Sequence, residues 1–224
     1  MQKRIKLSDR LLPSYTKAEE ITNMVTHIVG GVLAIWVFLS CLFKAIRNGN
    51  AIDIVGVIIY GSTMITVYAV SSVYHGLLPG TPKKVMQIID HCAIYFLIAG
   101  TYTPIMLSAF IPRYPLIGWC ILAAQWLLVG LAVTLTAIDL HKFKVFSMIC
   151  YIGMGWMIIL FLRQTITVMS FQGFALLLTG GIVYSIGAVL FGIGSKLKWM
   201  HSVFHVFVIV GSIFQYLAIY IYVQ

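Results

Sequence analysis

Histidine is the residue whose spacing in this sequence most directly suggests chemistry. His201 and His205 are four residues apart, so on a helix they project from the same face. Ser71 and His75 have the same spacing, and Asp90 begins another apolar stretch. Imidazole and carboxylate groups in apolar surroundings are costly, and they normally face a protein interior with a partner. These five residues are therefore the first candidates for a polar site.

Three neutral imidazoles, those of His75, His201 and His205, are a suitable ligand set for Zn²⁺. Three protein ligands and one water are typical of catalytic zinc, whereas structural zinc is usually closed by four ligands. In such a site Asp90 is a candidate to hold the water or accept its proton, and Ser71 to donate to a developing oxyanion. The alternative is a hydrogen-bonded cluster that holds helices together without a metal. Spacing alone leaves both interpretations open.

A second set of polar residues is spaced to form one stripe on a helix. Glu20, Asn23 and His27 stand at positions i, i+3 and i+7. We expect the stripe to face the interior and to surround the metal ligands as their hydrogen-bond partners. Glu20 is the one further carboxylate that we consider as a general acid, and His91 is interpreted as structural.

The elements that carry these residues must cross a bilayer. Of the 224 residues, 61% are hydrophobic and only 9% are charged, whereas soluble domains are about 25% charged. Asp, Glu, Lys and Arg are absent from seven stretches, namely 21–43, 54–82, 91–112, 114–138, 145–162, 164–195 and 199–224. A helix needs about 20 residues to cross about 30 Å of hydrocarbon. The predicted fold is therefore an all-α membrane protein, a bundle of seven transmembrane helices. Residues 1–20 form a short basic N-terminal segment, and residues 21–224 form a single membrane domain.

Lysine and arginine are distributed unequally between the two sides of this predicted bundle. Eleven of the 15 Lys and Arg residues fall on the side of the N-terminus. The positive-inside rule therefore places the N-terminus in the cytoplasm and the C-terminus outside. All six histidines then fall at the cytoplasmic ends, although the Lys and Arg count did not use them. We predict a multi-pass protein of the cell membrane with its metal site near the cytoplasmic face, and no nucleic-acid partner.

Paired glycines indicate where the helices pack. They occur at 30–31, 153 and 155, 180–181, and 192 and 194. Small residues let two helix backbones approach closely, so these positions are predicted contact points. The boundary between the fifth and sixth helices is predicted between Arg163 and Ser170.

The motifs together resemble those of a known family. The run Glu20-Ile-Thr-Asn-Met-Val-Thr-His27 resembles the first-helix motif of the progestin and adiponectin receptor family, whose bacterial branch is the haemolysin III family. Ser71-x-x-x-His75, Asp90-His91, Ala99-Gly-Thr-Tyr-Thr-Pro104 and His201-x-x-x-His205 follow in that family's order. The likeness covers nearly the whole chain.

The resemblance implies a Zn²⁺ ion near the cytoplasmic face, bound by His75, His201 and His205. It also implies that Asp90 reaches the ion through water and that Ser71 lies nearby. The family is part of a wider group of seven-helix membrane hydrolases, which includes alkaline ceramidases that cut lipid amides.

Three functions are compatible with these observations. The preferred one is a zinc-dependent hydrolase of a membrane lipid amide or ester, in which Asp90 takes a proton and Ser71 stabilises an oxyanion. The second is a non-enzymatic regulator of membrane lipid or energy homeostasis, in which zinc joins helices. The third is a haemolysin-type cytolytic pore, which the sequence supports least because no predicted helix carries a polar stripe along its full length.

Overall fold

The chain is a bundle of long helices in a computed structural model that describes residues 7–194 and 197–223. Those residues form no strand. The elements are η1 Leu7–Asp9, α1 Lys17–Asn48, α2 Ala51–Gly76, α3 Thr81–Pro104, the π-helical η2 Ile105–Phe110, α4 Pro115–Ile138, α5 Lys144–Trp156, η3 Met157–Phe161, α6 Leu162–Gly194 and α7 Met200–Tyr222. The all-α prediction is confirmed for the described part of the chain. Residues 1–6 of the predicted basic segment lie outside it.

The first two helices begin and end where the sequence supplies capping groups. The Thr16 side chain accepts from the backbone N–H of Glu19, and the Glu19 carboxylate accepts from the backbone N–H of Thr16, which is a complete capping box. Gly49 ends α1 with φ of 72°, a left-handed conformation that glycine adopts without a side-chain clash. Asn50 then caps α2 by accepting from the Ile52 N–H. These caps fix the start of α1, where Glu20 and Asn23 lie.

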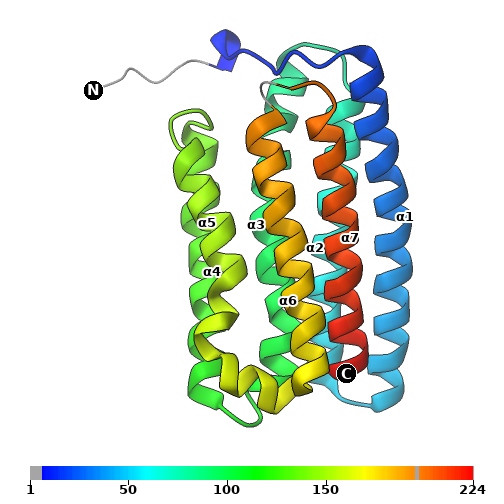
Figure 1. The fold of residues 1–224 in the computed structure, drawn as a ribbon, viewed down its shortest axis with the longest axis vertical. Helices are drawn as coiled ribbons and strands as arrows, with labels where there is room; N and C mark the ends of the chain where they lie inside the picture. Colours follow the sequence, from blue (N-terminus) through cyan, green and yellow to red (C-terminus); the bar gives the residue numbers. More distant parts are fainter. Residues whose placement is uncertain (1–6, 195–196, 224) are drawn as a thin grey trace.

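Within the described residues, six helical stretches are long and apolar enough to cross a membrane, one fewer than the predicted seven. The difference arises because the stretch Lys144–Gly192 counts as a single apolar run that contains α5, η3 and most of α6. With 13 residues, α5 is only about 20 Å long, shorter than a bilayer core of about 30 Å. The chain nevertheless changes direction inside this run, near the end of the bundle opposite to the start of α1 (Figure 1). Ser170 marks a break there, with a non-helical φ of 64°.

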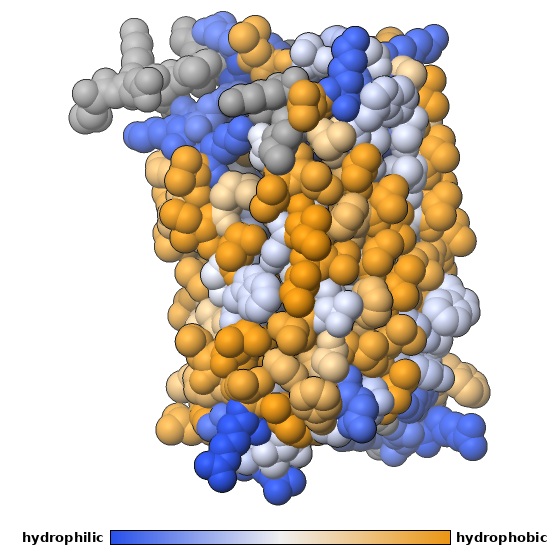
Figure 2. All heavy atoms as spheres, in the orientation of Figure 1, coloured by the Kyte–Doolittle hydropathy of each residue, from blue (hydrophilic) through white to orange (hydrophobic). Residues whose placement is uncertain are grey.

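Apolar side chains cover the outside of the bundle, and polar ones are common inside it. Figure 2 shows hydrophobic residues over the middle of the visible face and hydrophilic residues at both ends. Large hydrophobic side chains such as Leu39, Phe43 and Leu127 are exposed, whereas Asn23, Gln125 and Thr136 are fully buried. This distribution is typical of a protein whose surrounding solvent is lipid, because polar groups there find partners only in the interior.

The glycine prediction is confirmed at some positions and wrong at others. A Cβ atom on Gly30 would lie 2.6 Å from the Tyr68 ring, and one on Gly180 would lie 2.6 Å from Gln215 Nε2, so both glycines permit close helix packing. A Cβ on Gly153 or Gly155 would meet no atom within 4 Å. Composition alone does not distinguish a glycine at a helix contact from one on a free face.

The predicted site residues lie at one end of the bundle. Figure 1 shows the starts of α1, α3 and α7 and the end of α2 at the same end, and α7 finishes at the opposite one. This arrangement places His75, near the end of α2, beside His201 and His205 in the first turns of α7.

Candidate metal centre

Three histidine side chains from two helices meet in the interior. The Nε2 atom of His201 lies 3.3 Å from Nε2 of His75 and 3.1 Å from Nε2 of His205. One ligand atom from each residue lies within 4.8 Å of the other two, and all three residues are buried. The predicted ligands therefore lie close enough together to bind one metal ion.

Hydrogen bonds to Nδ1 of His75 and of His205 determine which nitrogen of each ring faces the space between the three histidines. His75 Nδ1 lies 2.7 Å from Glu20 Oε2, and His205 Nδ1 lies 3.2 Å from the main-chain oxygen of Asn23. A carboxylate and a carbonyl only accept, so in the neutral rings Nδ1 carries the hydrogen and Nε2 presents a lone pair. His201 Nε2 can donate to only one of these two nitrogens, so at least one lone pair at the centre has no donor. A cation held between the three Nε2 atoms accepts a lone pair from each ring, and imidazole nitrogen is a preferred ligand for Zn²⁺.

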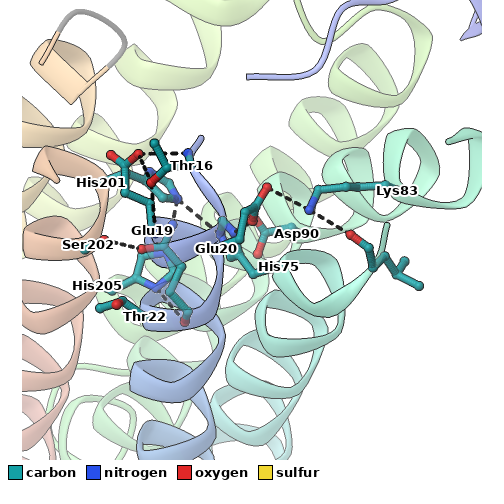
Figure 3. Close-up of polar contacts among 12 residues, drawn as sticks. Thr16, Glu19, Glu20, Thr22, His75, Lys83, Asp90, His201, Ser202 and His205 are labelled. Atoms are coloured by element: carbon teal, nitrogen blue, oxygen red, sulfur yellow. Dashed lines mark hydrogen bonds and ion pairs between the residues drawn. The ribbon is translucent and has the colours of Figure 1, made fainter. Parts of the chain in front are cut away.

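Glu20 connects the candidate ligand His75 to a buried lysine. Figure 3 shows the Glu20 carboxylate between His75 and Lys83. Lys83 Nζ lies 2.7 Å from Glu20 Oε1 and donates to the Leu77 carbonyl at 2.9 Å. The Lys83 side chain is only 4% exposed, so Glu20 neutralises a buried cation while it orients a ligand ring. In the sequence Lys83 counts only as an orientation charge, and no signal there indicates that it turns inward.

The segment before α1 covers the cluster from outside. The Tyr15 ring stacks on the His201 ring, with centroids 4.9 Å apart and planes inclined by 22°. Burial raises the pKa of the Tyr15 phenol above its usual value, and the negative charge of Glu20 raises it further. Close by, Glu19 Oε1 accepts from the backbone N–H of Trp199 at 2.7 Å, which joins the start of α1 to the start of α7. Sequence reasoning missed Tyr15 and Glu19, because they precede the apolar stretch and belong to no spaced pair.

The remaining residues of the α1 stripe contact the cluster in different ways. His27 stacks on His205 with ring centroids 3.6 Å apart, and neither His27 nitrogen has a hydrogen-bond partner among the described residues. Asn23 accepts from His205 through its backbone and from the Ser202 hydroxyl through its side chain, at 2.6 Å. All three stripe residues therefore lie against the histidine cluster, Glu20 and Asn23 through hydrogen bonds and His27 through stacking.

Asp90 and Ser71 lie beside the histidines rather than among them. Ser71 and Asp90 line the same cavity as His201 and His205. His91 Nδ1 is 3.8 Å from Asp90 Oδ2 and bonds to the Gln87 carbonyl at 2.8 Å. Asp90 and Ser71 are thus positioned near the metal ligands, and their catalytic roles stay predictions.

A cavity begins at these polar groups and continues between the helices. Its polar end is formed by Ser71, Asp90, His201 and His205. Beyond them it is lined mainly by apolar side chains of α3, α5, α6 and α7, and it reaches Gln215 on α7. From His201 to Gln215 the α7 axis advances about 21 Å. The site therefore combines a polar head with a long apolar cavity.

Comparison with known proteins yields one family. The model of the family described as Haemolysin-III related matches residues 15–216. The chain is 38% identical over 205 residues to Hemolysin-3 of Bacillus cereus, covering 92% of each chain. It is 35% identical over 208 residues to the Hemolysin-3 homolog of Bacillus subtilis (strain 168), covering 93% of this chain and 96% of the relative. The human Monocyte to macrophage differentiation factor is 27% identical over 175 residues, 73% of this chain and 68% of that protein. The resemblance inferred from the motifs is confirmed.

Proposed function

The chain belongs to the haemolysin III family of multi-pass membrane proteins, and we propose that it is a zinc-dependent hydrolase of a membrane lipid amide or ester. His75, His201 and His205 hold the ion. In the proposed placement the protein crosses the cell membrane seven times, with its N-terminus in the cytoplasm and the metal centre near the cytoplasmic face. The cation bias between the two sides supports this orientation.

The observation that carries the proposal is the cavity that joins the histidines to the apolar interior. The acyl chains of one leaflet occupy about 15 Å, half of a hydrocarbon core of about 30 Å. The residues that line the cavity extend along α7 from His201 to Gln215, an axial rise of about 21 Å, so an acyl chain can follow them while the head of the lipid stays at the polar end. A polar cluster that only holds helices together needs no such cavity, so the position of the cavity beside the histidines favours a lipid ligand.

The side chains at the polar end suit hydrolysis of an acyl bond. A bound Zn²⁺ supplies an acidified water and a polarised carbonyl. The Asp90 carboxylate accepts the proton released when water adds to the acyl carbon, and it returns a proton to the leaving amine or alcohol. Ser71 donates to the oxygen on which negative charge develops. Glu20 and Asn23 keep the His75 and His205 rings oriented, because each accepts the Nδ1 hydrogen of one ring.

The walls of the cavity indicate how a lipid enters. Both α5 and α6 line it, through Tyr151 and Trp156 on one side and Phe174 and Ala188 on the other. These two helices contact each other little, whereas α6 packs against α7 along its length. We expect acyl chains to enter from the bilayer between α5 and α6.

A second candidate function is a regulator in which the metal is structural. The observation that favours it is the closed surroundings of the cluster, which is buried, covered by Tyr15 and connected to α1 through Glu20 and Asn23. In that case the ion joins α2 to α7, and its removal lowers the stability of the whole bundle. The cytolytic activity named in the Bacillus cereus relative stays the third alternative.

The deciding experiment compares zinc-loaded wild type with Asp90→Asn in mixed lipid micelles, with acyl amides and acyl esters as substrates. Asp90→Asn keeps all three ligands, so it should retain zinc while its turnover falls by about 10²–10⁴, the usual contribution of general acid–base catalysis. The control is His205→Ala, which should lose both zinc and turnover. Absence of turnover in zinc-loaded wild type with both substrate classes, together with melting on zinc removal, would instead support the structural role.

A further inference from the structure

The apolar part of the cavity contains a polar side chain whose hydrogen bonding is incomplete. Gln215 of α7 lines the cavity and is only 6% exposed. Its Nε2 donates to the Leu177 carbonyl on α6 at 3.1 Å, whereas its Oε1 has no hydrogen-bond partner among the described residues. The bond to Leu177 identifies the two amide atoms, because a carbonyl accepts only from the nitrogen. The open position at Gln215 is therefore that of an acceptor.

The Gln215 amide is held in place where α6 and α7 pack together. A Cβ atom on Gly180 would lie 2.6 Å from Nε2 and 3.1 Å from the amide carbon of Gln215. The glycine thus leaves open the space that the amide occupies, and the bond to Leu177 holds the amide there. A donor for Oε1 has to come to this fixed position.

An unpaired acceptor in this place is costly, because a buried polar atom without a partner loses its hydration and gains nothing in return. Among the described residues that line the cavity, only His27 and Gln215 have side-chain nitrogen or oxygen atoms that are buried without a hydrogen-bond partner. His27 lies at the metal end, stacked on His205. Gln215 therefore marks a separate position in the apolar part of the cavity, which a molecule that fills the cavity can satisfy.

This position lies far from the bond that is to be cleaved. From His201 to Gln215 the α7 axis rises about 21 Å. A fully extended chain advances about 1.2 Å per single bond, a third of the peptide repeat. An acyl chain of about 16 to 18 carbons, with its carbonyl at the histidines, therefore brings its far end to Gln215.

From these observations we propose that the cavity selects a lipid whose acyl chain carries a hydroxyl group near its far end, and that Gln215 Oε1 accepts the hydrogen bond from that hydroxyl. The inference rests on the proposed function, because it requires an acyl chain in the cavity with its carbonyl at the histidines. A chain that ends in a methyl group leaves Oε1 unpaired, whereas a terminal hydroxyl donates to it. Gln215 thus acts on specificity and takes no part in bond cleavage.

The experiment measures binding and so does not depend on turnover. Zinc-loaded, full-length protein in detergent binds tritiated hexadecanoic acid in a scintillation proximity assay. Unlabelled hexadecanoic, 16-hydroxyhexadecanoic and 2-hydroxyhexadecanoic acids then compete for the site. The two hydroxy acids have the same composition and differ only in the position of the hydroxyl. We expect the 16-hydroxy acid to compete at concentrations about fivefold lower than the other two, the equivalent of about 1 kcal/mol for one neutral hydrogen bond.

Gln215→Leu should remove this preference, and Gln125→Leu is the matched control. Gln125 on α4 is also buried, its Nε2 donates to the Met154 carbonyl, and its Oε1 also has no partner among the described residues. Gln125 is not among the residues that line the cavity. Both variants lose the same kind of hydrogen bond, so an effect of packing alone should appear in both.

Equal competition by the two hydroxy acids in wild type would overturn the role of Gln215 and leave the lipid function intact. A preference that survives in Gln215→Leu, or that disappears equally in Gln125→Leu, would overturn it as well. If Gln215→Leu does not fold, the comparison of the two hydroxy acids in wild type still decides. Absence of binding by all three acids would overturn the acyl-chain cavity itself, and with it the proposed function.

Discussion

Glu20 offers the sharpest test of the metal centre, because it touches a ligand without being one. Its Oε2 accepts from His75 Nδ1 at 2.7 Å, and its Oε1 pairs with Lys83 at 2.7 Å. Glu20→Gln keeps the size of the side chain and one acceptor oxygen but removes the charge. A charge-assisted hydrogen bond is roughly twice as strong as a neutral one, so His75 becomes a poorer ligand.

The expected loss in zinc affinity is about 10- to 100-fold, the usual effect of removing such a partner. That corresponds to about 1.4–2.8 kcal/mol of binding free energy. The measurement is a competitive zinc titration against a chromophoric chelator, on protein purified in detergent. The same substitution leaves Lys83 buried without its counter-charge, which destabilises the fold independently of the metal. The double variant Glu20→Gln/Lys83→Met separates the two effects, because it should recover stability but not zinc affinity.

Glu19→Gln is the matched control for this experiment. Glu19 is the neighbouring carboxylate, yet its bonds go to Thr16 and to the Trp199 N–H rather than to a ligand histidine. The Glu19→Gln substitution weakens the cap of α1, so it should lower the free energy of unfolding by about 0.5–2 kcal/mol and leave zinc affinity unchanged. Wild-type zinc affinity in Glu20→Gln, alongside its loss in His205→Ala, would refute the reasoning.

Two further predictions concern packing and access. Gly30→Ala should destabilise the bundle by about 1–3 kcal/mol, because its Cβ would meet the Tyr68 ring at 2.6 Å. Gly153→Ala, where a Cβ meets nothing within 4 Å, should be neutral or stabilising by up to about 1 kcal/mol. Thermal unfolding in detergent checks both, and equal effects would contradict the packing described. Tyr15→Ala should speed the removal of zinc by a chelator, because the ring covers His201, whereas Tyr15→Phe keeps the stacked ring and should not. Stopped-flow chelation measures the rates, and identical rates in both variants would exclude a covering role.

The grouping of His75, His201 and His205 could be predicted from the sequence because helical periodicity and membrane depth both constrain these residues. His201 and His205 share a face by spacing alone, and alternation of the spans brings His75 to the same end. Lys83 and Tyr15 could not be predicted in this way. Tyr15 belongs to the segment that folds over the cluster before α1, and Lys83 lies in the first turn of α3 with its side chain turned inward. Neither helical periodicity nor hydropathy encodes these two orientations.

The division of the chain between α5 and α6 shows a different limit. Charged residues divide a sequence into apolar stretches, but they do not reveal where a helix stops within one. α5 ends at Trp156, before the charge at Arg163 that defined the predicted boundary. The later break at Ser170 depends on a single backbone conformation. The position of Ser170 in the predicted boundary region and the shortness of the fifth helix are therefore consistent with the sequence, whereas the end of α5 at Trp156 is not marked by any charge.

The hydrogen-bond pattern gives α1 a role that its sequence motif alone does not explain. None of the three candidate metal ligands lies on this helix, yet Glu20 and Asn23 accept the Nδ1 hydrogens of His75 and His205 on two other helices. The orientation of His75 and His205 therefore depends on how α1 packs against α2 and α7. Gly30 is one contact that sets this packing, two turns beyond Asn23. It follows that a change at Gly30, which touches no ligand, should weaken zinc binding as well as the fold, because both depend on the position of the same helix.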